Sequence, residues 1–490
     1  MGKSNIFYIT TAIDYPSGAP HIGHAYEKIL ADVIARWQRL KGKEVFLCTG
    51  TDEHGQKIEK YAKLENKTPR DFVNGMSAKF LKLCKLLNIS NDDFIRTTEQ
   101  RHIKVALALL EKAMQKGDIY KDEYEGFYCV ECESFYLERD LNQGNCPVHG
   151  KKADWIKEKG YFFKMSRYAQ AVLAHIEKNE DFIFPKTRRH EIINRIKEGV
   201  RDLSVSRSNF TWGIPWPGDD KHVVFVWFDA LINYVSATGY PDGERFKKFW
   251  PADIHMIGKD ILWFHTMVWM SILLSADIQL PKCVFVHGFI NLGGEKISKS
   301  TGATVDPVEL VEKYGADSLR YFLLREFSFT EDGNFSEAAL IRRINSDLAN
   351  DLGNLVYRSL TMVEKYFQGD LPQIYGQTSG KELFAFAQAL SDEVDKQMRE
   401  YNFSQSLAKI WEVINAANKF IEDTKPWVLF KEKKEEELKD FIFVLTYVIR
   451  KVQENIFPFM PETSESIKEQ FGEKKVKKGK PLFPRIENAD

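Results

Sequence analysis

The sequence has few of the features that mark specialised classes of protein. Its 490 residues include only 6 cysteines, too few for a disulfide scaffold. Lysine and arginine (69) almost equal aspartate and glutamate (70), so the net charge gives no overall attraction for nucleic acid. A nucleic-acid partner would have to bind to local basic patches. The longest apolar run, between Asp260 and Asp277, is shorter than the ~20 residues that span a bilayer, and the N-terminus lacks a signal-peptide core. We therefore expect a cytoplasmic protein with no membrane partner.

The first part of the chain alternates between strand and helix patterns. Residues 6–13 form a β-branched and aromatic run that is typical of a buried parallel strand. Apolar residues recur at helical spacing from Tyr26 to Leu40, and residues 45–49 predict a second strand. This order predicts a doubly wound α/β domain whose ligands lie at the carboxyl ends of its strands. The length of the chain suggests about three domains in all.

Two histidines open the first predicted helix, in the tetrad His21-Ile22-Gly23-His24. They lie three positions apart and so share one helical face, and Gly23 lets a ligand approach the backbone closely. A helix N-terminus also attracts anions through its free N–H groups. Two histidines near a helix start carry little information in isolation, but directly after a first strand they predict a phosphate-binding corner.

A second basic motif follows a strand predicted over residues 284–290. Glycines bracket Lys296-Ile297-Ser298-Lys299-Ser300, which is typical of a mobile loop that folds over phosphates, although a solvated turn fits the same residues. Basic residues also recur from Lys186 to Arg207, as a patch for phosphates or as a solvated helix face. A further basic stretch from Lys474 to Lys480 fits a solvated surface.

Four candidate metal ligands form two pairs. Cys129 and Cys132 are separated by two residues, as are Cys146 and His149, and thirteen residues lie between the pairs. This spacing predicts one closed, structural Zn²⁺ site in a small knuckle. Three unconnected thiols and a surface histidine are the alternative.

Strand patterns disappear from about Ser336 onward. Long helical patterns cover residues 340–366, 381–400 and 438–457, which predicts an all-α bundle. Between residues 117 and 221 the alternation of strand and helix is interrupted by the predicted zinc knuckle and by irregular segments.

The two basic motifs resemble the two signatures of class I aminoacyl-tRNA synthetases, HIGH and KMSKS. Ile297 replaces the methionine of the second signature and leaves both lysines in place. Throughout its length the chain resembles the methionyl-tRNA synthetase family, in its single-knuckle form. Further matching segments are residues 12–15, 51–55, 202–207, 226–234 and 257–265.

The resemblance implies a methionine–tRNA ligase. Such an enzyme activates L-methionine with ATP to methionyl-adenylate and pyrophosphate, then transfers methionine to the 3′ end of tRNA(Met), including the initiator tRNA. The resemblance also implies Mg²⁺ with the ATP and one structural Zn²⁺. Because little sequence follows the helical region, with no room for the module by which some relatives dimerise, we expect a monomer.

The resemblance further implies five parts of the chain. They are a first half of a Rossmann-like catalytic domain (1–116), a connective insertion with the zinc knuckle (117–221), a second catalytic half (222–290), a KMSKS loop and stem-contact region (291–335), and an α-helical anticodon-binding domain (336–490).

Residue roles follow from the same resemblance. The residues implied in catalysis are His21, His24, Lys296 and Lys299, and those implied in ATP binding are these four with Gly23, Gly258 and Asp260. The implied methionine site comprises Ile13, Tyr15, Asp52, Trp227, Ala230, Tyr234, Phe264 and His265, with Asp52 paired to the ammonium group. The implied metal ligands are Cys129, Cys132, Cys146 and His149, and the implied anticodon contacts are Asn354, Arg358 and Trp427. Leu231 departs from the family, which often has proline there, so the pocket floor is expected to differ slightly.

Other interpretations are open to test. Four sister synthetases are disfavoured. Isoleucyl, valyl and leucyl enzymes carry a much larger insertion than residues 117–221 allow, and a cysteinyl enzyme places zinc ligands in its amino-acid site, whereas here the candidate ligands are confined to the knuckle. A nucleic-acid-binding protein with a decayed nucleotide fold would not explain why both histidines and both lysines are intact. A small-molecule nucleotidyltransferase that shares the histidine corner would not need the helical end.

Overall fold

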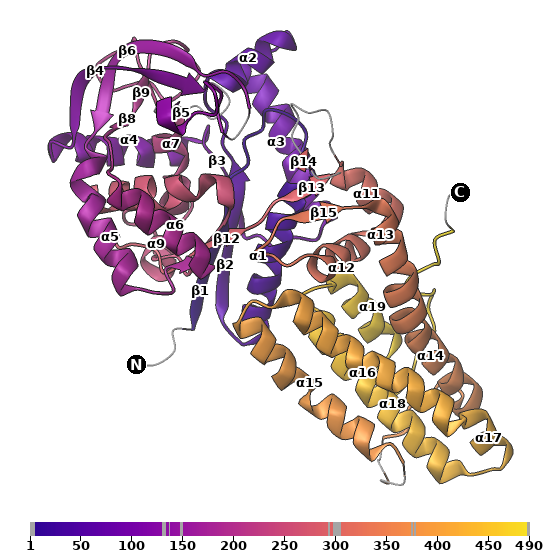
Figure 1. Cartoon of the computed structure of the whole chain (residues 1–490). Helices are drawn as coiled ribbons and strands as arrows, with labels where there is room; N and C mark the ends of the chain where they lie inside the picture. Colours follow the sequence, from indigo (N-terminus) through magenta and orange to yellow (C-terminus); the bar gives the residue numbers. More distant parts are fainter. Residues whose placement is uncertain are drawn as a thin grey trace. The chain divides into compact units, whose positions relative to one another are not determined.

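The computed structural model of the chain contains two compact units (Figure 1). Unit 1 comprises residues 1–85 and 89–289, and unit 2 comprises residues 86–88 and 290–490. The structure describes residues 5–129, 134–136, 138–147, 150–292, 295–296, 305–373, 376 and 379–487. Within these ranges, no helix has the length and apolar character needed to span a membrane.

Unit 1 is built around a six-stranded parallel sheet with the order β3-β2-β1-β11-β12-β7. Its strands are β1 (Ile6–Thr11), β2 (Glu44–Thr51), β3 (Asp93–Arg96), β7 (Ile183–Phe184), β11 (Ile254–Gly258) and β12 (Val284–His287). The chain places β2 and β3 on one side of β1, and later places β11 and β12 on the other side. The strand order therefore reverses between β1 and β11. Ligands of doubly wound sheets bind at this switch point, outside the carboxyl ends of the strands.

Helices lie on both sides of this sheet (Figure 1). The helix α1 (Ile22–Leu40) packs against β1 and β2, and its apolar stripe is buried there. A large core cluster joins other helices to β11 and β12. The remaining α-helices of the unit are α2 (Gln56–Leu64), α3 (Pro69–Leu86), α4 (Gln100–Gln115), α5 (Ala169–Lys178), α6 (Lys186–Lys197), α7 (Val226–Ala230), α8 (Asn233–Ser236), α9 (Glu244–Phe249) and α10 (Trp269–Ser275). Shorter helical segments are η1 (Glu138–Asp140), η2 (Met165–Tyr168), η3 (Lys259–Ile261) and the π-helical η4 (Phe264–Val268).

A smaller antiparallel sheet, β5-β4-β6-β8, lies in the region where the sequence pattern is interrupted. Its strands are β4 (Ile119–Cys129), β5 (Ser134–Tyr136), β6 (Asp154–Phe163) and β8 (Leu203–Ser204), and a separate pair is formed by β9 (Ser206–Arg207) and β10 (Val223–Val224). Between β6 and β8 the chain returns to the main sheet as β7, which pairs with β12. Residues 117–221 thus hold both an inserted sheet and an edge strand of the main sheet. A two-residue strand is too short to produce a sequence pattern, so the prediction did not include it.

Unit 2 begins with a three-stranded sheet and continues as helices. The strands are β13 (Ile290–Leu292), β14 (Glu295–Lys296) and β15 (Gly333–Phe335). The helices are α11 (Pro307–Tyr314), α12 (Ala316–Glu326), α13 (Glu337–Arg343), the π-helical η5 (Ile344–Gly353), α14 (Asn354–Phe367), α15 (Lys381–Arg399), α16 (Phe403–Thr424), α17 (Pro426–Lys431), α18 (Glu435–Ile456) and α19 (Pro461–Gln470). Helices α15, α16 and α18 pack against one another, as Figure 1 shows.

The predicted fold class is confirmed: a parallel α/β core precedes a mostly helical domain. The three long helical patterns correspond to the run from α13 through α14, to α15 and to α18. The strand predicted over residues 284–290 is shorter in the structure, because the chain leaves the main sheet after His287 and Ile290 begins a strand of another sheet.

Candidate active site

The N-terminus of α1 presents two adjacent imidazoles, tilted by 32° to each other, after the carboxyl end of β1. The ring centroids of His21 and His24 are 3.8 Å apart. Nδ1 of His21 accepts the backbone N–H of Gly23 (3.1 Å), and Nδ1 of His24 accepts that of His21 (3.0 Å), which forms a reciprocal cap. Because both Nδ1 atoms accept, the proton of each neutral ring is on Nε2, where it can be donated to a ligand. A Cβ atom at Gly23 would approach Cε1 of His21 to 3.0 Å, so glycine is favoured there.

A buried ion pair supports this histidine corner. Nζ of Lys28 lies 2.5 Å from Oδ2 of Asp14, whose other oxygen lies 3.9 Å from Nε2 of His24. Burial alone lowers the pKa of Lys28, but the charge of Asp14 raises it above its usual value. The backbone of Asp14 also bonds to Gly50 and Asp52 (2.9 and 2.8 Å), so the segments that follow β1 and β2 are tied together.

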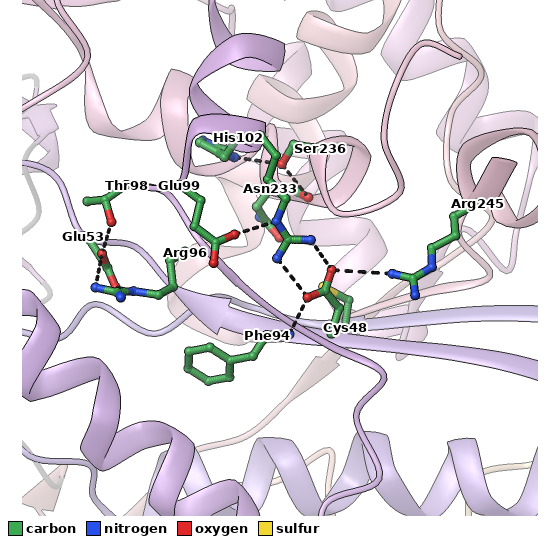
Figure 2. Close-up of polar contacts among 12 residues, drawn as sticks. Cys48, Glu53, Phe94, Arg96, Thr98, Glu99, His102, Asn233, Ser236 and Arg245 are labelled. Carbon is green, nitrogen blue, oxygen red and sulfur yellow. Dashed lines mark hydrogen bonds and ion pairs between the residues drawn. The ribbon is translucent and has the colours of Figure 1, made fainter. Parts of the chain in front are cut away.

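The loop that carries Asp52 is held by the buried carboxylate of Glu53 (Figure 2). This carboxylate accepts hydrogen bonds from the guanidinium of Arg96 (2.6 and 3.0 Å) and from the hydroxyls of Thr51 (2.7 Å), Thr98 (2.5 Å) and Ser77. Charge-assisted bonds of this kind are stronger than neutral ones, and five of them leave the loop little freedom. Asp52, which is 8% exposed, is thereby positioned at the carboxyl end of β2.

A second buried carboxylate, that of Asp229 on α7, faces two imidazoles. It lies 2.6 Å from Nδ1 of His54 and 2.7 Å from Nε2 of His102. Burial alone raises the pKa of Asp229, but the charges of His54 and His102 and their hydrogen bonds lower it to about 2. Asp229 is therefore ionised at neutral pH, and both facing nitrogen atoms donate to it.

Two aromatic rings predicted in the methionine site are stacked face to face. The ring centroids of Trp227 and Phe264 are 3.7 Å apart, and their planes differ by 6°. Trp227 is on α7, and Phe264 is the first residue of the π-helical segment η4, soon after β11. Both side chains are only half-buried. π-Helical turns are rare and occur frequently at functional sites.

Tyr234 and His265 form a buried hydrogen-bonded pair behind these rings. The hydroxyl of Tyr234 lies 2.7 Å from Nε2 of His265, whose Nδ1 lies 3.0 Å from the carbonyl oxygen of Ile261. Since a carbonyl only accepts, Nδ1 carries the proton and Nε2 accepts the hydroxyl of Tyr234. Burial lowers the pKa of His265 to about 4, so its ring is neutral at pH 7.

The carboxyl ends of β11 and β12 meet near α1. A Cβ atom at Gly258 would lie 2.9 Å from Oδ1 of Asp260 and 3.8 Å from Cε1 of His287. Nε2 of His287 in turn lies 2.9 Å from Oε2 of Glu27 on α1. Burial alone lowers the pKa of His287, but the hydrogen bond and charge of Glu27 raise it above its usual value. Gly258 and Asp260 thus border the same switch point as the histidine corner.

Several predicted residues lie outside the described residues. Lys299, Cys132 and His149 are among them, and Lys296 is described only in its backbone, as the end of β14. Cys129, at the end of β4, and Cys146 are described, and both are buried. Because two of the four predicted ligands lie outside the described ranges, these ranges contain no group of three or more metal-ligating side chains.

Most of the predicted basic patch between Lys186 and Arg207 is used internally. The guanidinium of Arg195 lies 4.1 Å from the ring centroid of Trp263, and that of the buried Arg207 lies 3.9 Å from that of Phe225. Other members bind nearby acceptors: Arg188 pairs with Glu191, Arg189 with the carbonyl oxygens of Ile176 and Glu177, and Lys197 with Glu177. The solvated or structural interpretation therefore fits these residues better than a phosphate patch.

The residues predicted to contact the anticodon lie in unit 2. Asn354 is exposed at the start of α14, directly after the π-helical η5. Arg358 lies one turn later, and its Nη1 is 2.7 Å from Oε1 of Glu422. Trp427 on α17 is 45% exposed, which is unusual for so large an apolar side chain.

The sequence patterns did not predict the buried polar groups that hold the site. Glu53 and His54 were visible only as part of a polar run after a strand, and Asp229 as part of an aromatic run. A buried charge needs a partner, so a charged residue within or next to an apolar run can be recognised as a candidate for an internal ion pair or hydrogen bond. Their partners, however, are up to 175 residues away in the chain and are brought together only by the fold.

Comparisons with known proteins find similar sequences over nearly the whole chain. The family model described as tRNA synthetases class I (M) matches residues 7–154 and 139–360, and the model of the anticodon-binding domain of tRNA ligase matches residues 380–486. The methionine–tRNA ligase of Caldanaerobacter subterraneus subsp. tengcongensis is 47% identical over 98% of this chain and 79% of its own length. That of Bacillus subtilis is 45% identical over 99% of this chain and 78% of its own.

Solved structures extend the comparison to the fold. Mycobacterium tuberculosis methionyl-tRNA synthetase in complex with methionyl-adenylate matches with a TM-score of 0.93 at 40% identity, covering 98% of this chain and 100% of that one. The apo form of the same protein matches with a TM-score of 0.86 at 38% identity, covering 99% of each chain.

Proposed function

The chain belongs to the class I methionyl-tRNA synthetase family, and from this premise we propose a role for each part of the site. It is a methionine–tRNA ligase, which activates L-methionine with ATP to methionyl-adenylate and pyrophosphate, then transfers methionine to the 3′ end of tRNA. The structural observation that best supports the assignment is the imidazole pair of His21 and His24 at the switch point of the parallel sheet.

The histidine corner is proposed to bind the phosphates of ATP. In the first reaction a carboxylate oxygen of methionine attacks the α-phosphorus and the bond to pyrophosphate breaks, so negative charge develops on phosphate oxygens. The Nε2–H groups of His21 and His24 and the positive end of the α1 helix dipole stabilise this charge. Lys296 and Lys299 add positive charge, and Mg²⁺ carried by the ATP would supply further positive charge for the pyrophosphate that leaves. The remaining nucleotide contacts are assigned to Gly23, Gly258 and Asp260.

Methionine is proposed to bind between the Asp52 loop and the aromatic side chains. Asp52 pairs with the ammonium group, and its low exposure strengthens the attraction because little water screens it. Trp227 and Phe264 contact the thioether, since sulfur–aromatic contacts are favourable by about 0.3–1.5 kcal/mol each. The neutral pair Tyr234–His265 closes the site without a charge that would repel an apolar side chain. Ile13, Tyr15 and Ala230 complete the proposed lining.

One structural Zn²⁺ is proposed on Cys129, Cys132, Cys146 and His149. The described residues fit this role: Cys129 ends β4, and the backbone of Gly150 bonds to the carbonyl oxygen of Cys146 (2.8 Å), which closes a turn there. Both thiols are buried, as metal-binding thiols of a small sheet should be. A bound ion cross-links the ends of such turns and so stabilises the small sheet.

The helical part of unit 2 is proposed to bind the anticodon of tRNA(Met), with the initiator tRNA included. The exposed indole of Trp427 can stack on an unpaired base, and Asn354 and Arg358 offer hydrogen bonds from one helical face. We also propose that the enzyme acts as a monomer in the cytoplasm, where the tRNA is used. Light scattering during size-exclusion chromatography of the full chain measures the oligomeric state.

Amino-acid-dependent ATP–pyrophosphate exchange tests the proposed activity. The purified full chain is assayed with methionine, isoleucine, valine, leucine and cysteine, and then with methionine and tRNA for aminoacylation. We expect exchange with methionine alone, followed by charging of tRNA. Exchange with another amino acid only would assign the chain to a sister enzyme, and the absence of exchange with all five would refute the ligase assignment.

A further inference from the structure

One buried hydrogen-bonded chain connects three parts of unit 1 that are far apart in the sequence. Beyond the bonds of Asp229 to His54 and His102, Nδ1 of His102 is hydrogen-bonded to Oγ of Ser236 on α8 at 2.8 Å, as Figure 2 shows. These four side chains are at most 4% exposed. None of the four belongs to the proposed contacts with methionine or ATP, so this row of hydrogen bonds has a separate role.

The members of this chain lie next to the two sides of the proposed methionine site. His54 is two residues after Asp52, in the loop that carries the ammonium partner. Asp229 lies between Trp227 and Ala230 on α7, and Ser236 follows Tyr234 on α8. The bond between His54 and Asp229 therefore joins the ammonium side of the site directly to the side that contacts the thioether.

We propose that Asp229 is a positioning residue for methionine recognition: through His54 and His102 it sets the distance and orientation between the Asp52 loop and the α7–α8 segment. This inference rests on the proposed methionine site. The Asp52 loop and the α7–α8 segment form two walls of the site, and they must meet the ammonium group and the thioether of one small molecule at the same time. A displacement of either wall therefore weakens binding of methionine. ATP, which is assigned to other residues, should be affected much less.

Two substitutions of Asp229, by alanine and by asparagine, differ in the hydrogen bonds that they preserve. Asp229→Ala removes both hydrogen bonds and lets the walls separate. In Asp229→Asn the amide oxygen accepts from His54, and the amide nitrogen can donate to Nε2 of His102 if that ring moves its proton to Nδ1. Oγ of Ser236 can then accept a hydrogen bond from this Nδ1–H, since the hydroxyl of Ser236 donates its own hydrogen to the carbonyl oxygen of Asn233 (3.1 Å). Asparagine therefore keeps the links and loses only the charge.

The test is ATP–pyrophosphate exchange by the full chain, with methionine varied at saturating ATP and ATP varied at saturating methionine. For Asp229→Ala we expect the KM for methionine to rise by about tenfold or more, with the KM for ATP changed less than about twofold. Asp229→Asn should restore the KM for methionine to within about threefold of the unmodified chain. Adding His54→Ala to Asp229→Ala should cause no further rise, because both changes break the same link.

Asp32→Ala is the matched control for a purely structural effect. Asp32 is equally buried in unit 1 and also accepts several hydrogen bonds, from Arg36 (2.8 Å) and from the backbone and hydroxyl of Ser90 (2.7 and 2.6 Å), but it lies on α1 away from the two walls. It should lower the melting temperature and leave the KM for methionine unchanged. An equal rise of this KM in Asp32→Ala, or an unchanged KM in folded Asp229→Ala, overturns the proposal.

A second pair of variants keeps the test decisive if Asp229→Ala does not fold. In His54→Asn the amide nitrogen replaces Nδ1 as donor to Asp229, whereas His54→Ala leaves no donor. Only the alanine variant should raise the KM for methionine, and equal values in the two variants refute the proposal. If the unmodified chain shows no exchange with methionine, the proposed function fails, and not only the role of Asp229.

Discussion

Acidification should destabilise unit 1 through His265. This ring is 2% exposed, its Nδ1 donates to a carbonyl, and burial lowers its pKa from 6.5 to about 4. Above pH 6.5 it is neutral in both the folded and the unfolded chain, so its full contribution to stability is present. As the pH falls below 6.5, the unfolded chain takes up a proton that the folded chain refuses, and this contribution is lost until about pH 4.

The size of the effect follows from the pKa difference. Each pH unit in this window costs about 1.4 kcal/mol, so lowering the pH from 7 to 5 should cost about 2 kcal/mol, and the full loss of about 3.4 kcal/mol is reached only below pH 4. For a domain of about 150–250 residues, 1 kcal/mol corresponds to roughly 2–4 °C in Tm. Unit 1, residues 1–85 and 89–289, is somewhat larger, so the lower end of this range applies and the share of His265 at pH 5 is about 4 °C.

Scanning calorimetry of the full chain and of His265→Gln at pH 7, 6 and 5 measures this share. Glutamine does not titrate, yet it can still accept from Tyr234 and donate to Ile261. The loss of Tm on acidification should be about 4 °C smaller in His265→Gln. Losses from other groups cancel in the comparison, except that of His255, whose pKa is lowered by burial and by the charge of His265. His190→Gln, a change at an exposed position on α6, should behave like the unmodified chain. Equal losses in the unmodified chain and His265→Gln would show that His265 is not held neutral by the fold.

Three further predictions concern the proposed phosphate, anticodon and metal contacts. Lys299→Ala should slow methionyl-adenylate formation in single-turnover assays by ~10²–10³-fold, because a charged contact to the developing phosphate charge is lost, and leave methionine binding intact; unchanged rates would remove this lysine from the site. Trp427→Ala should lower kcat/KM for tRNA in aminoacylation by roughly 5–150-fold, which corresponds to ~1–3 kcal/mol of lost stacking, and leave exchange unchanged; a parallel loss of exchange would indicate misfolding. Elemental analysis should find one zinc per chain, lost in Cys146→Ser and retained in Cys283→Ser; retention in both would exclude the proposed ligand set.

Local patterns were enough for much of the fold. The run of β-branched and aromatic residues after position 5 is β1, and the apolar stripe from Tyr26 to Leu40 is buried in α1. Both are signals carried by neighbouring residues, and they predict an element wherever its period is long enough. The edge strand β7 has two residues and therefore no period, so the sequence could not show that the chain returns to the main sheet there.

For the site, the amino-acid sequence by itself was enough to identify the two family signatures, the histidine corner and the order of a nucleotide-binding fold followed by helices. Only the tertiary structure decided which groups hold these parts in place. Five donor atoms from four positions converge on Glu53, and His54 and His102 converge on Asp229 from 175 and 127 residues away. The reason is physical: a buried charge is stable only beside partners, and folding chooses those partners by proximity in space, which the order of residues does not record.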